Sequence, residues 1–524
     1  MSLRLGIDVG GTNTDAVVLD EEARLLARFK SPTTSDVTTG IRNAIRGIIE
    51  EHPELDRSAI SHAMLGTTHC TNAILERRNL NRVGIVRIGA PATLAILPFV
   101  GWPSDLRDAI GGHYSVVEGG HEYDGREIRP LDLNAVREAA ESFKGQVDSV
   151  AVVSAFSPVD ASHEQRAAEV LLDVLGDVPV TYSHEIGSIG LLERENASIL
   201  NAAVVSAARM AAEGFENALK EHGIEARMFF SQNDGTLMAL EYAIRYPILT
   251  VASGPANSVR GAAFVSRLDD AIVVDVGGTS ADIGILVKGF PRESSIAVEV
   301  GGVRTNFRMP DLYSIALGGG TRVHTDGELR LGPDSVGYRL ADEGLVFGGT
   351  ELTLSDIAVA DGRASMGDPA RLEHLDRELV SRVSAMVREA CETAIDRMKT
   401  SADPMPVVLV GGGSVIIPDE LDGASAVHRP ENYDVANAIG AAIAQCSGEV
   451  ERIFSLDEYS REEALAMARQ MAADEAVAAG ADPEKVEIID VDEVPLAYLP
   501  GNATRIRVRA AGELKMSKEL VGQG

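Results

Sequence analysis

Cysteine, aromatic side chains and positive charge are all scarce in this sequence of 524 residues. Its three cysteines, Cys70, Cys391 and Cys446, lie far apart and form no CxxC pair. That spacing excludes a disulfide framework and a cysteine-rich zinc site, and it fits a reducing cytoplasm. Aromatic residues make up 4% of the chain, with one tryptophan, so a stacking platform for nucleic acid is not expected.

Basic residues are outnumbered by acidic ones, 48 to 79, which gives a formal net charge of −31. Because affinity for nucleic acid depends on neutralising phosphates, this charge disfavours a nucleic-acid partner. No apolar run approaches the ~20 residues of a membrane span. The N-terminus enters a strand at Leu3 without the basic region of a signal peptide. We therefore expect a soluble, cytoplasmic protein that binds neither nucleic acid nor membranes.

The sequence contains one short motif twice. Asp8-Val-Gly-Gly-Thr-Asn-Thr-Asp15 and Asp275-Val-Gly-Gly-Thr-Ser-Ala-Asp282 agree at six of eight positions, and each lies between two apolar runs. This pattern predicts a strand, a tight turn and a second strand. The glycines leave the N–H groups of the turn open to an anion, and the aspartates can hold a divalent cation beside a phosphate. One such hairpin in each half of the chain predicts two related lobes that close on one polyphosphate.

The remaining chain alternates predicted strands and helices, which indicates an α/β fold. Its length suits about three or four domains. We expect residues 1–190 to form an N-terminal lobe with the first hairpin and a substrate-side insertion, and residues 191–265 to form a helical segment between lobes. Residues 266–446 would form the second lobe, and residues 447–524 a small α+β appendage.

Three further turns carry glycine or hydroxyl groups. Residues 407–418 predict a strand that ends in Gly411-Gly412-Gly413, where an adenine or ribose could approach the backbone closely. Residues 61–72 predict a strand, a turn at Thr67 and Thr68, and a helix. Their polar groups either satisfy the helix N-terminus or bind a polar substrate. Ser253-Gly-Pro255 similarly predicts a helix cap or an anion site.

In chain order, the two hairpins and the late glycine strand resemble the phosphate-1, phosphate-2 and adenosine motifs of the actin/Hsp70/sugar-kinase superfamily. There is no GxxxxGK[ST] pattern, which excludes a P-loop. More narrowly, the chain resembles the hydantoinase A/oxoprolinase family over residues from about 5 to 360. The segments that carry this resemblance are GIDVGGTNTDAVVLD, GTTHCTNAILER, SGPANSVRGA, DVGGTSADI, ALGGGTRV with GPDSVG, and FGGTELTLSDI.

The resemblance implies two actin-like, RNase H-like lobes around an ATP cleft, and ATP-dependent opening of a cyclic amide or imide such as a hydantoin, lactam or oxoproline. Phosphorylating the amide carbonyl oxygen would create an activated group that water can attack. Because this oxygen carries no proton, the site needs positioning and charge neutralisation more than a general base. Asp8 and Asp275 are the expected Mg²⁺ ligands. Asp15 and Asp282 would orient the water shell of the metal or the substrate, and these four aspartates form the expected catalytic set.

The other expected site residues fall into two groups. ATP would be bound by the turn residues Gly10, Gly11, Thr12, Asn13, Thr14, Gly277, Gly278, Thr279 and Ser280 and by Gly411, Gly412 and Gly413. The substrate-side candidates are Thr67, Thr68, His69 and Asn72.

The chain also departs from the family. Asn13 stands where many relatives place an aromatic residue. The hydrolytic second half of oxoprolinase is missing, so either a partner subunit completes hydrolysis or this compact form performs only the ATP-dependent step. We expect a homo- or hetero-oligomer. Two alternatives stay open: a small-molecule kinase with Asp15 or Asp282 as the base, and a non-catalytic binding protein switched by ATP.

Overall fold

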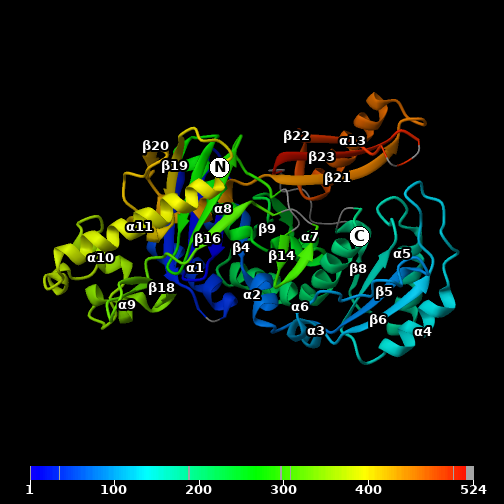
Figure 1. Cartoon of the computed structure of the whole chain (residues 1–524), viewed down its shortest axis with the longest axis horizontal. Helices are drawn as coiled ribbons and strands as arrows, with labels where there is room; N and C mark the ends of the chain where they lie inside the picture. The colour runs from blue at the N-terminus through cyan, green and yellow to red at the C-terminus, as the bar shows by residue number, and fades with distance from the viewer. Residues whose placement is uncertain are drawn as a thin grey trace.

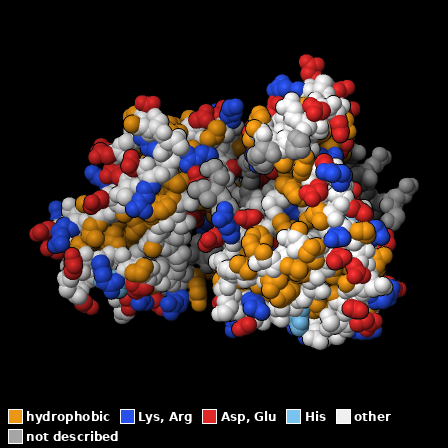
Figure 2. Space-filling model, turned by 45° about the vertical axis from the view of Figure 1, so that its right-hand side comes forward, with side chains coloured by type: hydrophobic (Ala, Val, Ile, Leu, Met, Phe, Trp, Pro, Cys, Tyr) orange, Lys and Arg blue, Asp and Glu red, His pale blue; other side chains and the backbone are white. Residues whose placement is uncertain are grey.

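A computed structural model describes residues 2–34, 36–186, 189–294, 298–306, 309–497, 499 and 501–514. Two mixed sheets organise the chain, one in each lobe (Figure 1). The space-filling view shows the surface hollowed between two masses (Figure 2). Among the described residues, no helix is long and apolar enough to cross a membrane.

The first lobe is built on a sheet with the strand order β3-β2-β1-β4-β9-β10. In it, β1 pairs antiparallel with β2 and parallel with β4, and β4 pairs parallel with β9. The strands are β1 (Leu3–Val9), β2 (Asn13–Leu19), β3 (Leu25–Pro32), β4 (Ile60–Thr67), β9 (Arg227–Ser231) and β10 (Leu237–Ala239).

The second lobe repeats this arrangement with the order β13-β12-β11-β19-β20, and β16 also pairs with β12. Here β11 pairs antiparallel with β12 and parallel with β19, as β1 does with β2 and β4. The two hairpins therefore occupy equivalent places in two related sheets, which confirms the predicted two-lobed α/β fold. The strands are β11 (Ala271–Val276), β12 (Ala281–Val287), β13 (Phe290–Pro291), β16 (Leu312–Ile315), β19 (Met405–Val410) and β20 (Ala424–His428).

Amphipathic helices cover both sheets. In the first lobe, α1 begins after Asp36, whose carboxylate accepts the amides of Thr38 and Thr39, and its buried isoleucines pack on the sheet. The helices of the two lobes are α1 (Val37–Glu51), α2 (His69–Glu76), α6 (Leu191–Glu221), α7 (Leu240–Arg245), α9 (Leu340–Glu343), α10 (Leu354–Ala360) and α11 (Arg377–Met398). Two small hairpins of the second lobe comprise β14 (Val298–Val300), β15 (Val303–Thr305), β17 (Thr321–His324) and β18 (Arg330–Ser335).

The insertion between α2 and α6 has a sheet of its own. All its strands are parallel, in the order β6-β5-β7-β8. Its elements are β5 (Val83–Ala90), α3 (Ser104–Ala109), β6 (His113–Glu118), α4 (Leu133–Phe143), β7 (Ser149–Ser154), α5 (Ser162–Leu175) and β8 (Val180–Tyr182).

Residues 191–265 differ from the expected helical segment, because β9 and β10 join the first sheet between α6 and the next lobe. The crossing itself is made by α8 (Ser253–Ser266), and α12 (Ala436–Ile443) returns the chain to the first sheet. The two helices pack backbone to backbone: a Cβ on Gly261 would lie 1.8 Å from Ala436 O. Glycine is thus required where the two connections meet.

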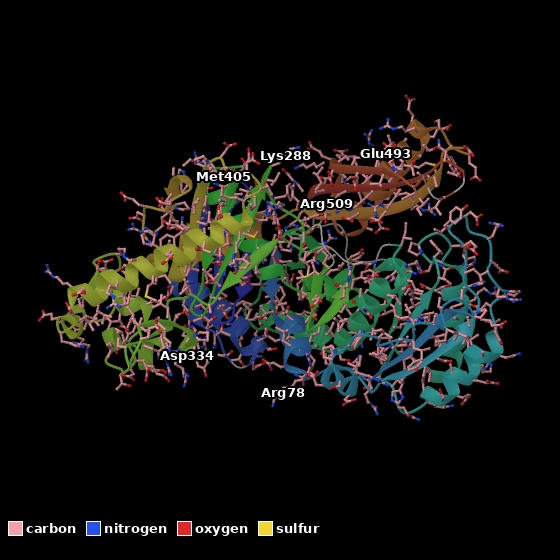
Figure 3. All side chains as sticks on the ribbon, in the orientation of Figure 1. Arg78, Lys288, Asp334, Met405, Glu493 and Arg509 are labelled. Atoms are coloured by element: carbon pink, nitrogen blue, oxygen red, sulfur yellow. The ribbon has the colours of Figure 1, made fainter. Side chains whose placement is uncertain are left out.

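The C-terminal region extends the first sheet through β21 (Cys446–Ser455), β23 (Ala503–Leu514) and β22 (Ala481–Pro495), with α13 (Arg461–Ala478) packed on them. Residues 515–524 lie outside the described part. Leu237 pairs with Cys446, so the expected appendage is continuous with the first lobe. It also reaches the second lobe, because the guanidinium of Arg509, on β23 and labelled in Figure 3, lies 5.2 Å from the ring centroid of Phe290.

Candidate functional site

The two glycine hairpins have the same local geometry. Asp8 lies opposite Asp15 in the first, and Asp275 lies opposite Asp282 in the second. The turn of the first hairpin is closed by the Gly10 amide donating to Asn13 O at 3.0 Å, and the turn of the second by the Gly277 amide donating to Ser280 O at 2.9 Å. The repeated motif therefore folds as the strand, turn and strand that its sequence predicts.

Backbone hydrogen bonds aim the turn amides of the second hairpin. Gly277 O accepts the amide of Gly319 at 3.0 Å, and Gly278 O accepts the amide of Gly320 at 2.7 Å. In a trans peptide, the C=O of one residue and the N–H of the next point in opposite directions. The N–H groups of Gly278 and Thr279 are therefore turned away from Gly319 and Gly320. Neither amide has an acceptor among the described residues. Both are free to donate to an anion.

The first hairpin is held in a similar way. The hydroxyl of Thr33 donates to Gly10 O at 2.8 Å, and its amide donates to Thr12 O at 2.9 Å. Within the described chain, the amides of Gly11 and Thr12 have no acceptor. The two turns also meet, since a Cβ on Gly278 would lie 2.6 Å from Thr12 Oγ1. The two turns, each with free amides, thus meet where the lobes approach each other.

The four aspartates of the hairpins form one electrostatic cluster. Burial raises the pKa of Asp8 to about 6 and that of Asp275 to about 7, and the pKa values of Asp15 and Asp282 are also raised by burial. The charges of Asp282, Asp8 and Asp15 raise the pKa of Asp275 further. Carboxylate oxygens with excess negative charge are the donors that a hard divalent cation prefers. The chemistry of these four side chains therefore fits the Mg²⁺ that the sequence suggests.

Several polar partners of the aspartates were not expected from the sequence. Asn257 Nδ2 donates to Asp8 Oδ1 at 3.1 Å, and Asn437 Nδ2 donates to Asp8 Oδ2 at 2.9 Å. Lys30 Nζ lies 2.5 Å from Asp15 Oδ1. Asn437 is the one polar side chain in the α12 segment ANAIGAAI. A lone polar residue in an apolar helix is the pattern that could have indicated a functional role.

The second hairpin has hydroxyl partners. Ser258, next to Asn257 on α8, hydrogen-bonds to Asp275, and the hydroxyl of Ser314 on β16 donates to Asp282. The start of α8, which was predicted at Ser253-Gly-Pro255 as a helix cap or an anion site, is therefore followed by residues that contact both hairpins. Its own start has no side-chain cap, because Ala252 occupies the cap position in a left-handed conformation.

Glycines on the neighbouring parallel strands make room for the first aspartate of each hairpin. A Cβ on Gly66 of β4 would lie 2.2 Å from Asp8 Oδ1, and a Cβ on Gly411, after β19, would lie 2.3 Å from Asp275 Oδ1. The expected adenosine turn also packs on the second hairpin, since a Cβ on Gly413 would lie 2.3 Å from Gly277 O. Gly412 faces open space. The structure thus places this turn beside the predicted phosphate site.

The substrate-side candidates lie close to the first hairpin but serve their own helix. Thr67 is the register partner of Val9, one residue beyond Asp8. Thr67 Oγ1 accepts the amide of His69 at 3.2 Å, and Asn72 Nδ2 donates to Thr68 Oγ1 at 3.3 Å. No described hydrogen bond or ion pair joins these groups to the aspartates. Thr67 and His69 also line a small, mostly apolar cavity with Cys70 and alanines of α6.

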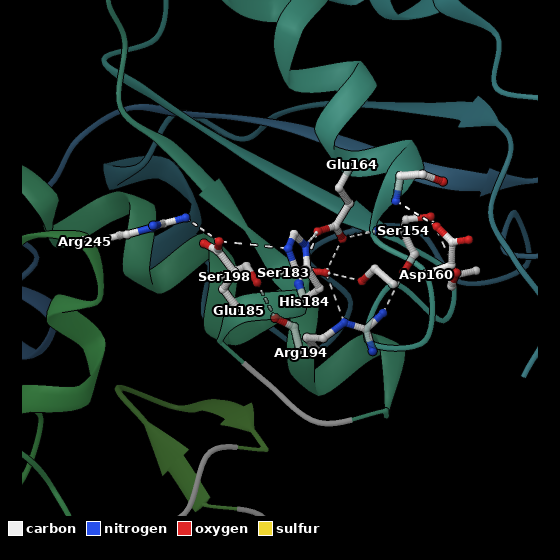
Figure 4. A network of polar contacts seen from close by, with 12 residues as sticks. Ser154, Asp160, Glu164, Ser183, His184, Glu185, Arg194, Ser198 and Arg245 are labelled. Atoms are coloured by element: carbon white, nitrogen blue, oxygen red, sulfur yellow. Dashed lines mark hydrogen bonds and ion pairs between the residues drawn. The ribbon is translucent and has the colours of Figure 1, made fainter. Parts of the chain in front are cut away.

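A second polar network lies in the insertion (Figure 4). The buried carboxylate of Glu164 accepts hydrogen bonds from the Ser154 amide at 2.7 Å, from His184 Nδ1 at 2.6 Å and from the Ser183 hydroxyl. Arg194 donates to Ser183 Oγ at 3.0 Å and to Ser154 O at 2.6 Å. These bonds join β7 and α5 to α6. Because the Glu164 carboxylate is satisfied, we assign the network a structural role.

His121, Glu127 and His163 of the insertion bring potential ligand atoms within 4.8 Å of one another. The Gly120 amide donates to His163 Nδ1 at 3.0 Å, and His163 Nε2 lies 3.1 Å from Glu127 Oε1. The proton of the neutral ring is therefore on Nε2. If His163 bound a metal through Nε2, its Nδ1 would carry the proton and donate a hydrogen bond. Here Nδ1 instead accepts one from the Gly120 amide. We assign no metal to this group.

Comparison with known proteins identifies relatives over most of the chain. The model of the hydantoinase/oxoprolinase N-terminal region matches residues 4–175, and the hydantoinase/oxoprolinase model matches residues 194–400. Caprolactamase subunit alpha from Pseudomonas jessenii is 29% identical over 398 residues, which are 70% of this chain and 55% of that protein. Acetophenone carboxylase gamma subunit from Aromatoleum aromaticum is 27% identical over 397 residues, 68% of this chain and 53% of that protein.

The chain spans about half the length of these two curated relatives. Among solved structures, the ATP-dependent caprolactamase from Pseudomonas jessenii aligns with a TM-score of 0.76 at 21% identity, covering 99% of this chain and 89% of that chain. At this level of identity the likeness concerns the fold, and it agrees with the two related lobes described above.

Proposed function

Because the chain belongs to the hydantoinase/oxoprolinase family, we propose that it uses ATP to phosphorylate and so activate a cyclic amide or imide for ring opening. The substrate class we propose is a hydantoin, a lactam or an oxoproline-type ring. One relative is named as a caprolactamase subunit, which is in keeping with this class.

The observation that carries this proposal is the pair of hairpins with free amides and four carboxylates. The N–H groups of Gly11, Thr12, Gly278 and Thr279 lack described acceptors and can donate to phosphate oxygens. Such preorganised donors stabilise charge on a transferring phosphoryl group without having to reorganise. The turn at Gly411, Gly412 and Gly413 would then lie against the nucleoside.

In the proposed reaction, the amide carbonyl oxygen forms a bond to the γ-phosphorus of ATP, and the bond from that phosphorus to the β,γ-bridging oxygen breaks, releasing ADP. Water then adds to the carbon that bears the phosphorylated oxygen. The ring C–N bond breaks as its nitrogen takes up a proton, which leaves an acyl phosphate, and a second water hydrolyses this to a carboxylate and phosphate. The chain's own contribution to the first step is positioning and charge neutralisation.

Asp8 and Asp275 are the residues that we propose to hold Mg²⁺, which when bound would neutralise phosphate charge. Lys30 pairs with Asp15, so the charge of Asp15 is already partly compensated. Thr67 and Thr68, beside the first hairpin, are the proposed substrate contacts, with His69 and Asn72 next to them on α2. We also propose a partner subunit for the hydrolytic step, since the two relatives described above are named as subunits.

Calorimetric titration of Mg·ATP into the pure protein and into an Asp275→Ala variant tests the site. We expect the parent to bind and the variant to bind at least tenfold more weakly. A folded parent that does not bind Mg·ATP would refute the proposal. Phosphate release stimulated by a hydantoin or lactam, with a ring-opened product, tests the reaction. A stable phosphorylated product would instead indicate a small-molecule kinase.

A further inference from the structure

Asp8 is the aspartate of the site whose two carboxylate oxygens are each held by an amide donor. Its side chain is 3% exposed. Asn257 reaches Oδ1 at 3.1 Å and Asn437 reaches Oδ2 at 2.9 Å. The second hydrogen of the Asn437 amide can serve Asp15 Oδ2, which lies 3.1 Å away. Asp8 is thereby fixed in orientation by donors that carry no charge.

This arrangement differs from that of Asp15 in the same hairpin. Asp15 lies against the ammonium group of Lys30 at 2.5 Å. A cation neutralises a carboxylate, whereas a neutral amide orients it and leaves its negative charge available. Of the two aspartates in the first hairpin, Asp8 is therefore the one prepared to face an added cation.

The two asparagines come from the two helices that connect the lobes. Asn257 is on α8 and Asn437 is on α12, and the helices touch through glycine: a Cβ on Gly440 would lie 1.9 Å from Asn257 O. Gly440 follows Asn437 by three residues, so both lie on one face of α12. Close helix packing thus sets the distance of both amides from Asp8.

The residue that follows Asn257 on α8 contacts the equivalent aspartate of the second lobe. Ser258 hydrogen-bonds to Asp275, the equivalent of Asp8 in the second hairpin. Consecutive residues of one connecting helix therefore hold the equivalent aspartates of both lobes. Helix α8 therefore contacts the first aspartate of each hairpin.

We propose that Asn257 and Asn437 are positioning residues, which hold Asp8 so that its charged carboxylate is directed to the divalent cation of the nucleotide. This inference rests on the proposed ATP-dependent function. Groups that orient metal ligands typically change metal affinity by about 10- to 100-fold when they are removed. Loss of either amide should therefore weaken the metal-dependent part of ATP binding more than ATP binding itself.

The test measures the dissociation constant of ATP by calorimetry in EDTA and again in saturating Mg²⁺, for the parent, Asn257→Ala and Asn437→Ala. The dissociation constant in EDTA divided by that in Mg²⁺ reports how much the metal strengthens ATP binding. We expect each substitution to lower this ratio by about tenfold or more. The matched control is Asn201→Ala. Asn201 is as buried as Asn257, but its amide donates to Thr181 and to the carbonyl of Arg245.

The control should lower thermal stability and leave the ratio unchanged. If both site variants keep the parental ratio, the positioning role is wrong even though the ATP site stands. If the parent shows no Mg²⁺-dependent binding, both this role and the proposed function fail. Should the fully buried Asn257 variant not fold, Asn437→Ala decides the question, because Asn437 lies at a partly exposed position.

Discussion

Replacing Asp275 with asparagine should stabilise the protein without nucleotide at pH 8. The carboxylate of Asp275 is buried beside three other aspartates, and these surroundings raise its pKa from 3.8 to about 7. Above that pH the folded chain carries a charge that it holds less well than the unfolded chain does. Asparagine has nearly the same shape, can accept the hydrogen bond of Ser258, and carries no charge.

The size of the effect follows from the pKa shift. One unit corresponds to ~1.4 kcal/mol, so a shift of about three units gives at most ~4 kcal/mol. Because the neighbouring aspartates share the repulsion, we expect a gain of about 2–4 kcal/mol in the free energy of unfolding. For a domain of roughly 150–250 residues this raises Tm by about 4–16 °C.

The gain in stability from Asp275→Asn should grow as the pH rises. A carboxyl group with a raised folded-state pKa causes no penalty below its unfolded pKa of about 4, because it is protonated in both states. The penalty grows between about pH 4 and pH 7 and is complete above pH 7. The gain from asparagine should therefore be full at pH 8 and less than half as large at pH 5.

Thermal unfolding followed by circular dichroism at pH 8 and pH 5 measures this. Asp326→Asn is a suitable control, since Asp326 is exposed in the turn between β17 and β18. Mg·ATP at 100 times its Kd should add about 2.7 kcal/mol to the parent and much less to the Asp275 variant. If Asp275→Asn is no more stable than the parent at pH 8, or gains equally at pH 5, the account of the carboxylate cluster is refuted.

Two further substitutions test parts of the same site. Gly66→Ala adds a Cβ only 2.2 Å from Asp8 Oδ1, so the Asp8 carboxylate must move. We expect Mg·ATP binding, measured by calorimetry, to weaken at least tenfold. Unchanged binding would show that Asp8 is not needed where the structure places it. Lys30→Met removes the cation beside Asp15, so thermal stability should fall at pH 8 by about 1–2 kcal/mol. It should recover at acid pH, because burial raises the pKa of Asp15 and a protonated Asp15 needs no cation. An equal loss at both pH values would mean that Lys30 contributes packing rather than charge.

The local elements were predictable because their information is contiguous in the chain. A repeated Asp-Val-Gly-Gly-Thr motif between apolar runs specifies a strand, a glycine turn and a strand, and both hairpins have that geometry. The capping of α1 by Asp36 and the turn at Asp326-Gly327 between β17 and β18 are local in the same sense. The duplicated motif also predicted two related lobes, since equivalent hairpins suit equivalent sheets.

Pairing between distant segments was less predictable. The strands after α6 join the first sheet, and β21 continues that sheet through the pairing of Leu237 with Cys446. An apolar strand pattern shows which face is buried but does not name the neighbouring strand. The boundaries expected at residues 191–265 and 447–524 therefore separated segments that share one sheet.

The supports of the site depended on tertiary structure for the same reason. Asn257 lies 249 residues from Asp8 along the chain, and Asn437 lies 429 residues from it. Their contacts exist because α8 and α12 dock through glycines at backbone distance, which no local pattern specifies. The sequence by itself determined the two hairpins and placed in them the groups that we propose to bind a phosphate and a cation. Packing of the connecting helices decided how those groups are held, because a carboxylate's orientation and charge depend on what is placed around it.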